Sequence, residues 1–289
     1  MDPKYLVPKS MAFLFGIIIP ASFVLYVDWV KKKVASKLIK KKDEEEYIDY
    51  KMIEFQLKKK MTYREAELKY MLPYTFIYIC ILIIFFLLIG QYINFDLIKI
   101  FFSSKYNKTI KEKFFGTITI LIINFILYSG LLVQFFIGNE ELYKKTPFCY
   151  FMENIYGPAI EEVIYRGILF TLFKQAGYNG IKSAIYSSLT FSLSHFRHVF
   201  DIYFTKEDIP HLFFQSFYTF LFGFYTCYAY NYSGCIFAPI FLHGICNTLQ
   251  MPRISYLKDL NISKFTKHFI SFCYISGIIG WVLLIKVYH

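Results

Sequence analysis

The chain has 289 residues, of which 56% are hydrophobic, 21% aromatic and 18% charged, and its formal net charge is +11. Soluble domains average about 45–50% apolar and about 25% charged residues, so this composition excludes an ordinary soluble domain. The apolar residues fall in runs long enough to cross about 30 Å of hydrocarbon, which indicates several membrane helices. The lysines lie mainly between these runs, which favours contact with anionic lipid over nucleic-acid binding.

Eight hydrophobic segments are predicted to form membrane-crossing helices. In chain order they cover residues 11–29, 72–93, 115–138, 158–175, 181–199, 211–231, 233–250 and 267–287. The fourth, fifth and seventh segments contain polar residues and are therefore less hydrophobic. The first segment leads into a lysine run without a cleavable signal pattern, so it is predicted to be retained as a helix. The predicted fold class is an all-α polytopic membrane protein with about eight transmembrane helices.

The stretch from Lys31 to Lys69 joins the first two segments and is dense in charge. It contains three K-K-K runs and the acidic run D-E-E-E at 43–46. Acidic and basic residues on neighbouring turns can pair on a solvated helix, so we interpret the stretch as a charged helical hairpin. The alternative is a basic face that lies on the membrane surface.

The distribution of basic residues predicts the orientation of the chain. With eight spans, four loops lie on one side, and they carry about twenty basic residues against about ten on the other. The positive-inside rule places these four loops in the cytoplasm and both termini on the opposite side. The loops are residues 31–69, 139–157, 197–210 and 251–266.

The six cysteines indicate neither a disulfide framework nor a zinc knuckle, because none has C-x-x-C spacing. They are Cys80, Cys149, Cys227, Cys235, Cys246 and Cys273.

The first polar motif in an apolar segment is G-P-A-I-E-E-V-I-Y-R-G at residues 157–167. Pro158 suits the first turn of a helix, and the helix dipole favours two carboxylates near that end. Glu162 and Arg166 have i,i+4 spacing and are expected to pair, whereas Glu161 points about 100° away and is expected to be free to take a proton from water. The simpler interpretation is a capped helix start with a surface ion pair.

Two further motifs place histidines in apolar helices. In F-S-L-S-H-F-R-H at 191–198, Phe191 is one turn before His195, and His198 follows three residues later. In L-H-G-I-C-N at 242–247, His243 and Asn247 share one helix face. Each motif could also be a hydrogen-bonded part of the helix bundle.

The predicted topology brings these motifs to one side of the membrane. Glu161 lies near the cytoplasmic start of the fourth segment and His195 near the cytoplasmic end of the fifth. His243 and Asn247 lie about two turns below the cytoplasmic end of the seventh. An ionisable residue at membrane depth is retained when it is paired, faces water or has a function. We therefore expect the four residues to meet in one cavity that faces the cytosol.

These three motifs resemble those of the type II CAAX prenyl endopeptidases, the Ras-converting-enzyme group of the CAAX-protease and bacteriocin-processing superfamily. The pattern of that family is E-E-x-x-x-R, then F-x-x-x-H, then H-x-x-x-N or H-x-x-x-D, and the order and type match here. H-F-x-H at 195–198, together with Cys246, Asn247 and the following Pro252, resembles the eukaryotic prenyl protease branch. Motif support covers about residues 150–255.

The resemblance implies a protease that removes the a-a-X tripeptide from prenylated CAAX proteins, such as small GTPases, without a metal or other cofactor. It implies that Glu161 is the general base, that His195 orients the water and moves its proton, and that His243 and Asn247 donate to the oxyanion. Glu162, Arg166, Phe191 and His198 would be supporting residues. The implied location is the endoplasmic reticulum membrane, with the site facing the cytosol and in contact with lipid.

The expected organisation is one membrane domain in three parts. Residues 1–150 would form N-terminal membrane helices with a charged cytosolic segment at 31–71. Residues 151–255 would form the catalytic helical core, and residues 256–289 the C-terminal membrane helix.

Three alternatives use the same residues. Glu161, His195 and His243, with His198 as a fourth ligand, could bind zinc, although H-E-x-x-H is absent. A thiol protease could use Cys246, although that cysteine and His243 share one helix. A transporter or a scaffold that binds prenylated tails without cleaving them would also need buried polar residues.

Overall fold

The computed structural model describes residues 7–40, 63–93, 108–137, 146–196, 209–250, 254–257 and 262–287. These residues form helices and no strands. The long helices are α1 (Lys9–Lys40), α3 (Tyr63–Ile93), α5 (Ile110–Leu127), α6 (Ser129–Ile137), α10 (Gly180–Ser194), α11 (Ile209–Ser233), α12 (Phe237–Leu249) and α13 (Lys264–Val287). A further helical run covers residues 147–175, and η6 (Ile254–Leu257) is a short 3₁₀ turn.

Within the described residues, each of the eight predicted segments falls largely on a helix. The third segment is bent, because α5 and α6 meet at an angle of 59°. Among the described residues, two helices are long and apolar enough to cross a membrane, Lys9–Val30 and Lys264–Lys286, and the bent pair makes up to three. The all-α class and the apolar character of a membrane protein are thus confirmed, and the count of eight spans stays a prediction.

The fourth helical run begins earlier than predicted. Thr146 caps α7 (Pro147–Phe151) by accepting a hydrogen bond from the Cys149 backbone N–H. The π-helical turn η2 (Met152–Tyr156), α8 (Gly157–Glu162), the π-helical run η3 (Val163–Phe170) and α9 (Thr171–Gln175) then follow without interruption. Tyr156 has helical backbone angles. The prediction that the helix starts at Pro158 is therefore wrong, because the wider π-turn lets the helix pass through the proline.

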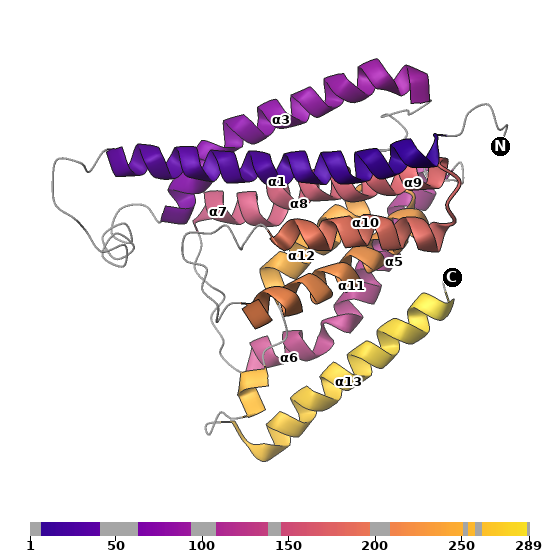
Figure 1. Cartoon of the computed structure of the whole chain (residues 1–289). Helices are drawn as coiled ribbons and strands as arrows, with labels where there is room; N and C mark the ends of the chain where they lie inside the picture. The colour runs from indigo at the N-terminus through magenta and orange to yellow at the C-terminus, as the bar shows by residue number, and fades with distance from the viewer. Residues whose placement is uncertain are drawn as a thin grey trace.

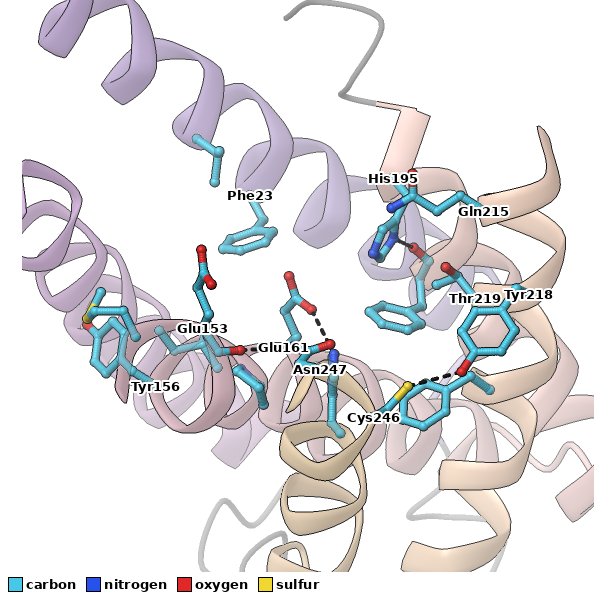
Figure 2. Close-up of a pocket in the computed structure, with 18 of the residues that line it drawn as sticks. Phe23, Glu153, Tyr156, Glu161, His195, Gln215, Tyr218, Thr219, Cys246 and Asn247 are labelled. Carbon is cyan, nitrogen blue, oxygen red and sulfur yellow. Dashed lines mark hydrogen bonds and ion pairs between the residues drawn. The ribbon is translucent and has the colours of Figure 1, made fainter. Parts of the chain in front are cut away.

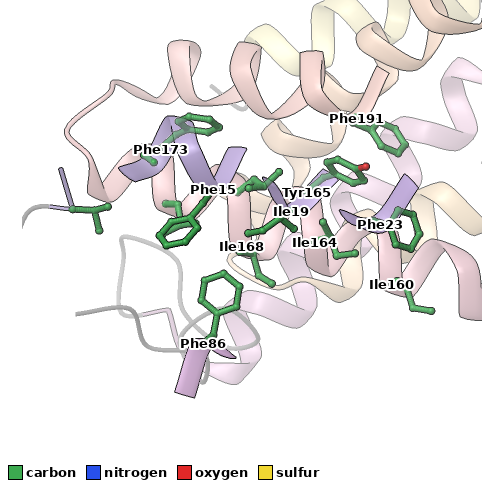
Figure 3. Close-up of a cluster of buried hydrophobic side chains, with 14 of the residues drawn as sticks. Phe15, Ile19, Phe23, Phe86, Ile160, Ile164, Tyr165, Ile168, Phe173 and Phe191 are labelled. Atoms are coloured by element: carbon green, nitrogen blue, oxygen red, sulfur yellow. The ribbon is translucent and has the colours of Figure 1, made fainter. Parts of the chain in front are cut away.

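The main apolar core lies between α1 and this fourth run (Figure 3). Phe15, Ile19 and Phe23 of α1 are buried against Ile164 and Ile168 of η3. Phe86 of α3 belongs to the same cluster, and its ring packs against Phe15 in a tilted arrangement with 6.3 Å between the centroids. Since α1 and α3 are held to the fourth run in this way, they can supply one wall of a cavity next to it.

Several helices begin or terminate at the same end of the bundle (Figure 1). The end of α1 and the starts of α3, α7 and α11 lie at this end, together with the ends of α10 and α12. The start of α1 and the end of α13 lie at the opposite end. α13 packs mainly on α5 and α6 and leaves most of its surface uncovered, as expected for a helix that faces lipid.

Candidate active site

A cavity of about 690 Å³ lies between the middle of α1, the first parts of α3 and α11, and the ends of α10 and α12. Glu161, His195, His243 and Asn247 all line it, so residues up to 86 positions apart in the sequence meet at one surface. Figure 2 shows Glu161, His195 and Asn247 around this cavity. The four residues come from three elements: α8 supplies Glu161, the end of α10 supplies His195, and α12 supplies the other two.

His243 lies between the two carboxylates of the E-E pair. Its Nδ1 is 2.8 Å from Glu162 Oε1, and its Nε2 is 3.8 Å from Glu161 Oε2. The Glu162 side chain is fully buried, whereas that of Glu161 is 16% exposed and reaches the cavity. The expectation that Glu161 is left free is therefore wrong, because His243 of α12 lies next to its carboxylate.

The predicted pair of Glu162 and Arg166 is confirmed. Arg166 Nε lies 3.1 Å from Glu162 Oε2, and neither side chain has any exposed surface. The guanidinium also stacks on Phe191, with its carbon 4.2 Å from the ring centroid. Gly223 of α11 makes this possible, since a Cβ there would lie 3.0 Å from an Arg166 nitrogen. The cation is thus held by one carboxylate and one aromatic face in a dry environment.

Phe191 connects the two histidines. Its ring makes edge contacts with His195 at 4.9 Å and with His243 at 5.9 Å between centroids. His195 is the C-cap of α10, and its Nδ1 lies 3.0 Å from the Phe191 carbonyl oxygen. A donor at Nδ1 leaves Nε2 of the neutral ring as the proton acceptor. Phe222 of α11 packs on the other side of His243 at 5.2 Å.

Asn247 is held by the π-turn in the fourth run. In η2 the Gly157 N–H bonds to the Met152 carbonyl, one residue further back than in an α-helix, which leaves the Glu153 carbonyl without this partner. Asn247 Nδ2 donates to that carbonyl at 2.8 Å. One of the two amide protons of Asn247 therefore serves helix docking, and the other can serve a ligand.

Pro158 leaves a second backbone carbonyl available for contact with α12. Proline has no N–H, so the Asn154 carbonyl has no partner four residues later. Gly244 of α12 sits directly against that carbonyl oxygen, which is closer than any Cβ could approach. Thr248 Oγ1 donates to the Asn154 side chain at 3.2 Å. These contacts thus fix where α12 packs along the fourth helical run, and with it the position of His243.

Sequence reasoning missed the rest of the cavity wall. Phe23 and Val27 of α1 contribute to it, as do Leu68, Met71 and Thr75 of α3. One face of α11 contributes His211, Gln215, Tyr218, Thr219 and Phe222. These residues belong to no motif, and only the 3.6-residue period of α11 could have grouped its members. His198 and most of the charged segment 31–71 lie outside the described residues.

The cysteines and possible metal ligands can be placed as well. All six cysteines are free thiols. Cys246 is buried, with its Sγ 3.1 Å from the Tyr218 hydroxyl rather than next to His243. Within the described ranges, no three His, Cys, Asp or Glu side chains are grouped so that they could hold a metal ion.

Comparison with known proteins agrees with the motifs. The family described as type II CAAX prenyl endopeptidase Rce1-like matches residues 144–249. The chain is 29% identical over 138 residues to a CAAX prenyl protease 2 of Arabidopsis thaliana, a match that covers 45% of this chain and 41% of the relative. It is 26% identical over 107 residues to a CAAX prenyl protease 2 of Homo sapiens, covering 35% and 32%.

A CAAX prenyl protease 2 of Caenorhabditis elegans is 29% identical over 102 residues, covering 34% of this chain and 38% of the relative. The matches thus span about two-fifths or less of the curated relatives. No solved structure matches the chain. The matched segment begins just before α7 and ends with α12, so it contains every residue of the three motifs. The predicted family resemblance is confirmed.

Proposed function

From the match of residues 144–249 to the type II CAAX prenyl endopeptidases, we propose that this chain is an intramembrane protease that removes the a-a-X tripeptide from prenylated CAAX proteins. The observation that carries the proposal is the array Glu161–His243–Glu162–Arg166 at the wall of a cavity of about 690 Å³. One carboxylate of this array is buried and bonded on both sides, and the other reaches the cavity.

Glu161 is the general base in this proposal. Its carboxylate accepts a proton from a water molecule, and the resulting hydroxide adds to the carbonyl carbon of the prenylated cysteine. Glu162 cannot take this role because His243 and Arg166 occupy its two oxygens at 2.8 Å and 3.1 Å. His195, across the cavity, orients the water and then moves the proton from Glu161 to the nitrogen of the leaving amine. The C–N bond then breaks and releases the tripeptide.

His243 and Asn247 stabilise the oxyanion that forms on the carbonyl oxygen. Asn247 uses the amide proton that does not bond to Glu153. His243 donates from Nε2 when its ring carries both protons, and the carboxylates on either side balance that charge. Such a donor typically contributes about 2.7–4 kcal/mol to the rate. Phe191, and His198 seven residues after it in the sequence, support these groups.

The setting of the reaction follows from the lipid on the substrate. Enzyme and prenylated substrate share a bilayer, and we propose the endoplasmic reticulum membrane with eight spans and the cavity facing the cytosol. The apolar wall formed by Phe23, Val27, Leu68 and Met71 suits the prenyl chain. The polar residues of α8, α10 and α12 on the other walls suit the peptide.

The test is release of the tripeptide from a farnesylated peptide by the purified chain. We expect Glu161→Gln to lower kcat by about 10²–10⁴-fold, the usual contribution of a general base, at an unchanged unfolding temperature. Asp28→Asn is the matched control, since this carboxylate pairs with Lys32 outside the cavity, and it should cleave normally.

The other readings predict different results. Loss of activity with a chelator and recovery with zinc would make Glu161, His195 and His243 metal ligands. An inactive Cys246→Ser variant that still folds would favour a thiol protease. Binding of the farnesylated peptide by the folded wild type without any product would refute the protease and leave a scaffold.

A further inference from the structure

One face of α11 carries a polar stripe that none of the sequence motifs includes. His211, Gln215 and Thr219 are spaced four residues apart, so they lie above one another on the helix. All three line the cavity, together with Tyr218 and Phe222. Figure 2 shows Gln215, Tyr218 and Thr219 on its wall. Thr219 is buried, Gln215 is half-buried and His211 is exposed. The stripe therefore runs from the inside of the cavity to its mouth.

We propose that this stripe binds the a-a-X tail of the substrate and that His211, with Gln215, holds its terminal carboxylate. The inference rests on the proposed function and adds the residues that recognise the leaving tripeptide. His211 and Gln215 are specificity-determining residues in this view, because they touch the substrate away from the reacting bond.

The charged groups that line the cavity identify His211 as the side chain that can bind the terminal carboxylate. The carboxylate of a C-terminal residue needs cationic or N–H donors when it leaves bulk water. The carboxylate and histidine side chains among the described lining residues are Glu153, Glu161, His195, His211 and His243. The carboxylates repel a terminal carboxylate, and no described lysine or arginine lines the cavity. His195 and His243 face the reacting bond, so His211 is the remaining group that can become a cation.

The lengths of helix and peptide agree with this position. The ring of Phe222 touches His243, which places the reacting bond at the level of Phe222 and Thr219. An α-helix rises about 1.5 Å per residue, so Gln215 lies about 6 Å and His211 about 12 Å from Thr219 along the axis. Three extended residues span about 10 Å. A tripeptide therefore ends between Gln215 and His211, where both side chains can donate to it.

The cavity wall formed by α1 and α3 is less suited to the a-a-X tail than the stripe on α11. The lining residues of α1 and the start of α3 are apolar apart from Thr75, whose hydroxyl is bonded to the Met71 carbonyl at 2.8 Å. An extended peptide with unpaired backbone groups is costly against such a wall. The stripe on α11 offers a hydroxyl, an amide and an imidazole instead. The peptide is thus expected along α11 and the lipid along α1 and α3.

The test compares a farnesylated peptide that ends in a free carboxylate with the same peptide ending in a carboxamide. A hydrogen bond to a charged group contributes about 1.5–3 kcal/mol, so wild type should have a KM at least about tenfold lower for the carboxylate. His211→Ala should raise that KM to the carboxamide value with little change in kcat, and His211→Arg should restore the difference. His268→Ala is the matched control, because His268 is an exposed histidine on α13, outside the cavity.

The outcomes separate the inference from the function it rests on. If wild type cleaves neither peptide, the proposed function fails. If wild type cleaves both peptides with equal KM, or if His211→Ala changes both KM values alike, the protease stands and the role of His211 is refuted. A tail lengthened by one residue is a second check, and it should lose affinity in wild type but not in His211→Ala.

Discussion

The pair formed by Glu162 and Arg166 shows how one buried residue can organise several others. Glu162 bonds to Arg166 along its own helix and to His243 across the bundle. Arg166 in turn covers Phe191, the ring that contacts both histidines. Removing one partner of a buried ion pair leaves an uncompensated charge in a medium that solvates it poorly. Glu162 is therefore as important for folding as for the position of His243.

At the residue scale, we predict that Glu162→Ala lowers the free energy of unfolding by about 3–5 kcal/mol, the usual cost of breaking a buried pair. Asp28→Ala breaks a pair with the same i,i+4 spacing, between Asp28 and Lys32, at 2.8 Å. The side chains of that pair are 23% and 74% exposed, so its loss should cost at most about 1 kcal/mol. Thermal unfolding in detergent measures both. Equal effects would contradict the structural role of Glu162.

The sequence predicted the contact of Glu162 within its own helix but not its contact with α12. Helical spacing paired Glu162 with Arg166, because that contact lies within one helix. It could not predict that His243, which is 81 residues from Glu162, bonds to that carboxylate and lies next to Glu161, which was expected to be free. Contacts between helices depend on how the helices dock, and no local pattern records that.

At the scale of elements, the docking of α12 on the fourth helical run positions the site. Met152–Tyr156 forms a π-turn, and Pro158 lacks an N–H, so two neighbouring carbonyls face outward. Asn247 bonds to one of them and Gly244 sits against the other. The sequence placed Pro158 at a helix start, since that is where prolines usually occur, and it could not predict a helix that continues through one.

At this scale, we predict that Gly244→Ala lowers both the unfolding temperature and kcat. The new Cβ would collide with the Asn154 carbonyl oxygen, a backbone atom that cannot swing away, so α12 must move and carry His243 with it. Gly180→Ala in α10 is the control, because a Cβ there meets no atom within 4 Å. That change should be neutral or stabilise by up to about 1 kcal/mol. A fully active Gly244→Ala variant would show that the close approach is not required.

The whole molecule has a cavity end and an opposite end. The cavity is lined by the middle of α1, the first parts of α3 and α11, and the ends of α10 and α12. The start of α1 and the end of α13 lie at the other end (Figure 1). The order of the helices was predictable, because eight apolar runs separated by charge are visible in the sequence. The contribution of α1 and α3 to the cavity was not, since no motif links them to Glu161.

At the molecular scale, we predict that the two ends lie on opposite sides of the membrane. Glycosylation acceptor sites added before α1 and after α13 should be modified in microsomes, and sites inserted in the 41–62 segment should not. The physical reason is the excess of basic residues in the loops at the cavity end, which the positive-inside rule keeps in the cytoplasm. Modification of the inserted sites would reverse the proposed orientation and leave the fold untouched.

The π-turn before α8 also limits how this segment can change in length. Each residue of a helix turns the chain by about 100°, so losing one residue from Met152–Tyr156 would close the turn into an ordinary α-helix and rotate everything before it relative to Glu161. The helix would remain intact, yet the carbonyls that receive α12 would point elsewhere. Many substitutions leave such a turn in place, whereas a one-residue deletion or insertion does not. The number of residues in this segment is therefore constrained more tightly than their identity.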